Sequence, residues 1–85
     1  MKLYSIYDSA SQEHMPPFAA KNDLIAMRMC HTIIKSQPDI LHELTLTYLG
    51  DFDIETGTIY SEVMQLKPLY KIATMQLPNK GDTEL

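Results

Sequence analysis

The chain has 85 residues, of which 45% are hydrophobic and 21% are charged, and its formal net charge is −4 at pH 7. This length and composition fit one small domain with a modest core and exclude a chain that is disordered throughout. We expect no membrane span, because no apolar run approaches the ~20 residues that a spanning helix needs, and no signal peptide. The single cysteine, Cys30, excludes an intrachain disulfide and fits a reducing cytoplasm.

Charge is unevenly distributed along the chain. Residues 1–38 have a net charge of +1, residues 39–62 carry six acids without Lys or Arg, and residues 63–81 carry three lysines without an acid. An acidic chain is poorly suited to non-specific nucleic-acid binding, because that affinity comes mainly from neutralised phosphates. The separate basic segment keeps nucleic acid open as a partner. The alternative is a solvated acidic edge followed by lysines that only keep the chain soluble.

The first third of the chain predicts a strand, a loop and a helix. Residues 2–8 alternate and are rich in β-branched and aromatic side chains, which favours a strand. Residues 9–20 indicate a polar loop made rigid by two prolines and anchored on the core by Phe18. Asn22 is the expected N-cap of one amphipathic helix of about 13–15 residues, which ends before Pro38.

Residues 44–52 carry the clearest strand pattern, because apolar and polar side chains alternate along them. Tyr48 and Phe52 fall on the apolar side of this alternation, and if they face the helix, Phe52→Ala is expected to cost about 3–5 kcal/mol. Gly50 interrupts that face and indicates a bulge or a close approach of another backbone segment.

A hairpin turn is expected next, at residues 53–57, where Gly57 supplies a positive φ. Residues 58–63 then return as the partner strand. Pro68 interrupts the apolar run that follows, which suits either a short helix or an edge strand. That run either completes the core or forms a surface for self-association.

The expected fold is therefore α+β. It is a small β-α-β-β domain in which one helix packs on an antiparallel sheet, with a C-terminal strand or short helix to follow. We place the domain at residues 1–77 and a flexible tail at residues 78–85. One helix covers one face of such a sheet and leaves the other for solvent, a partner or a second subunit.

No residue pattern predicts an enzyme, a metal site or a cofactor. The acids from Asp51 to Glu62 are spaced as in a calcium-binding loop, but Thr56 stands where that loop needs glycine, and a hairpin explains the spacing. Cys30 and His31 are adjacent on a helix and point about 100° apart, so they form no thiolate–imidazole pair. One cysteine and three scattered histidines do not make a zinc site.

Tyrosine and basic side chains are the candidates for binding. Tyrosines on an open sheet face stack on single-stranded bases, while Lys and Arg contact phosphates. The alternative is that these rings pack inside the core or across neighbouring strands. The candidate nucleic-acid-binding residues are Lys2, Tyr4, Arg28, Tyr48, Tyr60, Lys67, Tyr70 and Lys71.

Several segments of residues 1–63 occur in the order found in one family of phage proteins. These segments are Met1–Asp8, Met15–Phe18, Lys21–Asp23, Ala26–Arg28, Leu49–Asp53 and Thr56–Gly57. Through them the chain resembles the small nonstructural protein of gokushovirus-type microviruses, tiny phages with circular single-stranded DNA.

The resemblance implies an accessory protein of the infected host cytoplasm that is absent from the mature virion and acts in genome replication or packaging. It implies no catalytic residues. Our first hypothesis is a homo-oligomer that binds single-stranded DNA or a phage or host protein of the replication and packaging machinery. Our second is a protein-interaction module that uses the acidic hairpin and the apolar C-terminal run, without nucleic-acid contact. Neither hypothesis involves a membrane.

Overall fold

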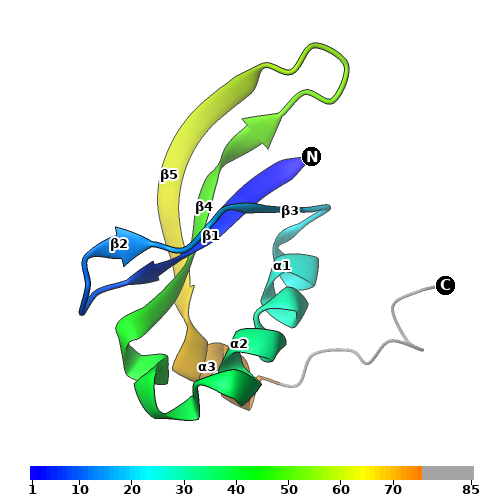
Figure 1. Ribbon diagram of the computed structural model, residues 1–85. Helices are drawn as coiled ribbons and strands as arrows, with labels where there is room; N and C mark the ends of the chain where they lie inside the picture. The colour runs from blue at the N-terminus through cyan, green and yellow to red at the C-terminus, as the bar shows by residue number, and fades with distance from the viewer. Residues whose placement is uncertain (76–85) are drawn as a thin grey trace, which may run out of the picture.

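The computed structural model describes residues 1–75, which form an antiparallel five-stranded sheet with helices on one side (Figure 1). The strands are β1 Lys2–Asp8, β2 Glu13–His14, β3 Phe18–Ala20, β4 Leu44–Phe52 and β5 Ile59–Pro68. The helices are α1 Asp23–Met29, α2 His31–Ser36, the 3₁₀ helix η1 Pro38–Glu43, and α3 Leu69–Thr74. The α+β class is confirmed. The predicted domain end at residue 77 and the predicted tail, residues 78–85, lie outside the described residues.

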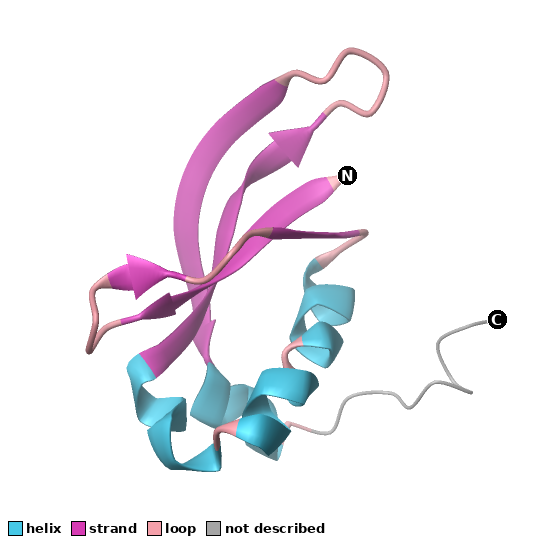
Figure 2. Cartoon of the chain, viewed as in Figure 1, coloured by secondary structure: helices cyan, strands magenta, loops and turns pink. Residues whose placement is uncertain are grey.

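β1 is the central strand of the sheet, whose order is β2-β1-β4-β5. On one side β1 pairs with β4, with Ile6 opposite Leu46. On its other side it pairs with both β2 and β3, one at each end. β5 pairs only with β4 and so forms the opposite edge of the sheet (Figure 2).

The polar loop predicted for residues 9–20 is wrong in part, because this segment pairs twice with β1. Tyr7 lies opposite His14 in β2, and Tyr4 lies opposite Phe18 in β3. Two prolines stand between these strands, and proline has no N–H to donate to a sheet. They therefore divide what would otherwise be one continuous partner strand into two short ones.

The predicted single helix is divided at Cys30 into α1 and α2. The N-cap prediction is confirmed, since the side chain of Asn22 accepts a 2.9 Å hydrogen bond from the Ile25 N–H. At the division the Cys30 N–H is shared between the carbonyls of Ala26, at 3.2 Å, and Met27, at 3.1 Å. Such a shared bond tightens the turn and interrupts the regular α-helical pattern.

The apolar run after residue 63 was expected to form either a short helix or an edge strand, and the structure has both, one after the other. β5 extends beyond the predicted strand end to Pro68, and α3 begins at the next residue. α3 brings Leu69 and Ile72, both fully buried, beneath the sheet, so this run completes the core. The sequence pattern did not predict the 3₁₀ helix η1 that leads into β4.

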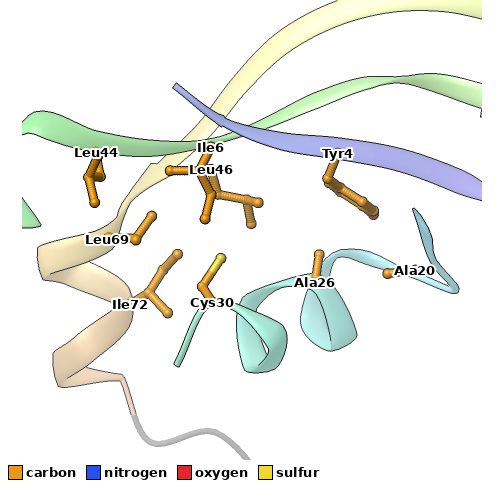
Figure 3. Close-up of a cluster of buried hydrophobic side chains, with 9 residues drawn as sticks. All are labelled: Tyr4, Ile6, Ala20, Ala26, Cys30, Leu44, Leu46, Leu69 and Ile72. Carbon is orange, nitrogen blue, oxygen red and sulfur yellow. The ribbon is translucent and has the colours of Figure 1, made fainter. Parts of the chain in front are cut away.

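The core lies between the helices and one face of the sheet (Figure 3). Cys30 is 1% exposed there, as expected of a residue on the apolar face of an amphipathic helix. The buried hydrophobic side chains are Tyr4, Ile6, Ala20, Ala26, Cys30, Leu44, Leu46, Leu69 and Ile72.

A bulge in β4 changes which side chains reach this core. Leu3 lies opposite Gly50 and Tyr4 opposite Tyr48, so Leu49 is an extra residue in β4. The bulge reverses the alternation, and Tyr48 packs against the core while Phe52 is not part of it. The prediction that Phe52 shares the buried face with Tyr48 is therefore wrong.

The two glycine predictions are confirmed. Gly50 has φ of +148°, and a Cβ there would collide with the backbone carbonyl of Tyr60. Gly57 has φ of +79° in the β4–β5 turn, and its N–H donates a 2.8 Å hydrogen bond to the Asp53 carbonyl. The first glycine thus permits a close approach and the second closes the hairpin.

Candidate functional site

Tyr4 was a candidate nucleic-acid contact, but its side chain is fully buried in the structure. Its ring stacks on Phe18 with 5.9 Å between centroids and meets the edge of Tyr48 at 5.8 Å. Its hydroxyl donates a 2.6 Å hydrogen bond to Asp23 Oδ1. Burial, followed by this bond and the Asp23 charge, raises the pKa of Tyr4 well above its usual value. The ring is a core element and cannot stack on a base in this fold.

Tyr48 and Lys2 lie together in a hollow of about 210 Å³ on the helix side of the sheet. Lys2 Nζ lies 5.9 Å from the centre of the Tyr48 ring, a cation–π contact. Desolvation, followed by the charges of Asp51 and Glu62, raises the pKa of Tyr48. The lining residues are Lys2, Asp23, Tyr48, Asp51, Met64 and Leu66.

These carboxylates make the hollow a poor place for a nucleic-acid backbone. Asp23 and Asp51 line it, and Glu62 is close enough to shift the pKa of Tyr48. A phosphate entering here would meet several negative charges and one lysine that already faces a ring. Tyr60, 60% exposed, lies opposite Asp51 in the sheet and shares this acidic setting.

The β4–β5 hairpin projects from the body of the domain (Figure 1). Ile54 at its tip is 74% exposed and stands between Asp53 and Glu55. Asp53 Oδ1 accepts hydrogen bonds from the N–H groups of Glu55, at 2.9 Å, and Thr56, at 3.3 Å. These bonds lower the pKa of Asp53 and hold the turn in shape. The hairpin therefore presents one apolar side chain within an acidic surround.

Three other candidates lie at the far end of the domain, where β5 meets α3. Lys67 is in β5, while Tyr70 and Lys71 are in α3, a helix without acidic residues. The Tyr70 ring stacks on His42 of η1, with 4.4 Å between centroids and 20° between planes. Leu66, which lines the Tyr48 hollow, directly precedes Lys67 along β5, but Lys67, Tyr70 and Lys71 are not among the lining residues, so the sequence candidates do not share one site. Arg28 lies in the last turn of α1.

An apolar pocket of about 270 Å³ was not predicted from the sequence. It opens between the Met15–Phe18 segment and the two consecutive helices, and it is of a size to accept one apolar side chain. The sequence feature that could have indicated the pocket is its two methionines, Met15 and Met29, because methionine adapts well to varied apolar ligands. Its lining residues are Ile6, Met15, Pro16, Phe18, Met29, Thr32 and Ile33.

Ser5 and His14 form a pair that resembles a nucleophile and its base. Ser5 Oγ and His14 Nδ1 are hydrogen-bonded at 2.6 Å, and the His14 ring lies 4.8 Å from that of Tyr7. Ser5 is only 1% exposed, so a substrate cannot reach its hydroxyl. The pair instead fastens β2 to β1.

Within residues 1–75, no group of three or more His, Cys, Asp or Glu side chains is placed to hold a metal ion. In the same part of the chain, no helix is long and apolar enough to cross a membrane.

Comparison with known families identifies the protein as a phage protein. The family model described as Phage ORF5 protein matches residues 1–75, which include every element of the fold through α3. The chain therefore belongs to the Phage ORF5 protein family. No curated protein and no solved structure is similar enough to this chain to be matched to it.

Proposed function

We propose that this protein is a nonstructural accessory protein of a gokushovirus-type microvirus, acting by protein contact rather than by catalysis. Its role lies in single-stranded DNA genome replication or packaging in the cytoplasm of the infected host, outside the mature virion. Membership of the Phage ORF5 family supplies the phage context. The ordered segments from Met1 to Gly57 support the microvirus assignment.

The hairpin tip is the observation that favours a protein partner. An aliphatic side chain that is 74% exposed gains free energy by entering an apolar pocket on another protein. The acids on either side of Ile54 add a preference for a partner with a basic surface around that pocket. The partner class is thus a basic phage or host protein of the replication or packaging machinery.

A photo-crosslinking amino acid at position 54 tests this function in infected cells. We expect it to capture a basic phage or host protein, and we expect Ile54→Ser to lose that protein in affinity purification. Met29→Ser is the control, since Met29 is also an exposed hydrophobic side chain, at 45%, but lies in α1, outside the hairpin and β5. Equal recovery of the partner by the two serine variants would contradict the proposal.

Direct binding of single-stranded DNA remains a second candidate, supported by the β5–α3 end alone. Lys67, Tyr70 and Lys71 provide two cations and a ring in a segment free of acids. The test is binding to labelled single- and double-stranded oligonucleotides across a salt series. Salt-sensitive, single-strand-selective binding that Lys71→Glu abolishes and Lys2→Glu preserves would favour this candidate. Binding lost equally in both variants, or absent at low salt, would reject it.

A further inference from the structure

The outer edge of β5 is a long, exposed sheet edge. β5 is the last strand in the sheet order, and every residue from Ile59 to Gln65 is exposed. A strand at an edge presents unpaired backbone N–H and C=O groups to a second strand. Proteins usually protect such an edge with lysine, proline or a covering loop. β5 carries a lysine and a proline only at its last two positions, Lys67 and Pro68, and residues 59–66 contain one charge, Glu62, and no proline.

The edge is also apolar, which adds to its capacity for pairing. Four of its side chains are large hydrophobics that remain about half exposed or more. They are Ile59 at 58%, Tyr60 at 60%, Val63 at 68% and Met64 at 47%. Apolar and aromatic side chains on neighbouring strands are the pairs that stabilise a sheet.

We propose that β5 pairs antiparallel with β5 of a second copy of this protein, across a twofold axis at Met64. The two sheets become one continuous sheet through the pairing. Such an isologous contact gives a closed dimer, because the β5 edge of each copy is paired with that of the other and neither is left free to bind a third copy. The surface is therefore a dimer interface and not a route to fibres.

The geometry of antiparallel pairing limits the possible registers. Side chains directly opposite each other lie on the same sheet face, so a twofold axis must set one residue opposite its own copy. Centring the pairing on Glu62 would set two carboxylates face to face, which is unfavourable. Centring it on Met64 sets two apolar side chains together instead.

The Met64 register also joins opposite charges. Lys67 lies opposite Leu46 and Gln65 opposite Thr47, so Leu66 is an extra residue in β5 and Lys67 returns to the face of Met64. A second irregularity lies between Ser61 and Met64, where two residues of β5 stand opposite Leu49, and Glu62 still acts on Tyr48, which is the partner of Met64 in the sheet. Counting from the axis, Glu62 lies opposite residue 66 of the second copy, beside its Lys67. Each dimer thus contains two Glu62–Lys67 contacts between copies. This self-complementary charge pattern is why the edge fits a second copy of the chain.

Disulfide formation tests the register directly. Met64→Cys is expected to form a disulfide-linked dimer readily under mild oxidation, because the two position-64 side chains face each other across the axis. Ile54→Cys is the control, since it is equally new and more exposed but lies at the hairpin tip. The native Cys30 is 1% exposed and stays out of the reaction. A similar rate for the two variants, or none for Met64→Cys, would overturn the proposed register.

Exchange of the charges at positions 62 and 67 tests the interface a second way. We expect sedimentation equilibrium to show a dimer, and Glu62→Lys or Lys67→Glu to raise its dissociation constant about tenfold each. The double variant restores the contact with its sign reversed and regains the dimer, which a variant that had merely unfolded would not do. A wild-type chain that remains monomeric at high protein concentration would overturn the proposal, as would a double variant no better than the single ones.

Discussion

The Tyr4 hydroxyl donates a 2.6 Å hydrogen bond to the Asp23 carboxylate, and this bond joins the central strand to the first turn of α1. Asp23 is also well placed for the helix, because an acid in the first turn is stabilised by the helix dipole. The two residues come from the first and third of the segments that resemble the microvirus family. The bond gives these two segments a structural role: they fix the helix at one end of the sheet.

Loss of the Tyr4–Asp23 hydrogen bond should lower the free energy of unfolding by more than a typical hydrogen bond contributes. Tyr4→Phe keeps the ring in the core but leaves the Asp23 carboxylate without its buried donor, and we expect a loss of about 1.5–3 kcal/mol. Urea denaturation measures the difference. Tyr60→Phe is the matched control, because the Tyr60 ring is 60% exposed, and it should change stability by less than about 0.5 kcal/mol. Equal effects would show that the bond does not stabilise the fold.

Cys30 should make the protein less stable in alkali. Burial raises the pKa of its thiol from 9.0 to about 11, so between these values the folded state holds a proton that the unfolded state has lost. The free energy of unfolding is unaffected by this thiol below pH 9. It falls as the pH rises toward 11, by about 2 kcal/mol in total. Thermal unfolding of wild type and Cys30→Ala across pH 8–11 measures this. Parallel pH profiles for the two proteins would contradict the prediction.

The bulge at Leu49 predicts that truncation of two large side chains of β4 will lower stability by very different amounts. Leu46 is fully buried, so Leu46→Ala is expected to cost about 2–5 kcal/mol. Phe52→Ala should cost less than about 1.5 kcal/mol, because Phe52 lies outside the core cluster. Chemical denaturation of both variants settles the order. A larger loss for Phe52→Ala would mean that the bulge is absent and the strand alternates without interruption.

The two positive-φ glycines should respond differently to alanine. Gly57→Ala meets no atom within 4 Å, so its cost is conformational, about 1–2 kcal/mol. Gly50→Ala adds to that cost a collision with the Tyr60 carbonyl and an approach of 2.8 Å to Ser61 Cα. We therefore expect Gly50→Ala to be the more destabilising, with Thr56→Ala as the mild control. Melting temperatures in any other order would argue against the close approach of β5 to Gly50.

Local sequence patterns predicted the elements whose structure is set locally. The Asn22 cap, the strand at residues 44–52 and the turn at Gly57 depend on side-chain bonding or φ preference within a few residues. The pairing of β2 and β3 with β1 depends on contacts that no local pattern encodes. The segment that holds β2 and β3 is polar and contains two prolines, so its sequence alone indicates a loop. It becomes strand through hydrogen bonds with β1, such as that from the Met15 N–H to the Ile6 carbonyl, at 2.8 Å.

The candidate site was harder to predict because residue type does not reveal exposure. Tyrosine serves equally in a core, as Tyr4 does, and on a surface, as Tyr60 does. One extra residue at Leu49 was enough to exchange the faces of the side chains that follow it. The apolar pocket combines side chains from a strand, a loop and two helices, so only the folded chain brings them together.

The central place of β1 sets an order of events for folding. Tyr48 follows Tyr4 by 44 residues, so the β1–β4 ladder closes a long loop, whereas the β4–β5 hairpin closes a short one. β1 must therefore wait for β4 to be synthesised, while β4 and β5 can pair as soon as both have left the ribosome. We expect substitutions in the hairpin turn to slow folding, and those at the Tyr4–Asp23 bond chiefly to speed unfolding. Stopped-flow kinetics with the reverse pattern would assign the nucleus to the N-terminal half.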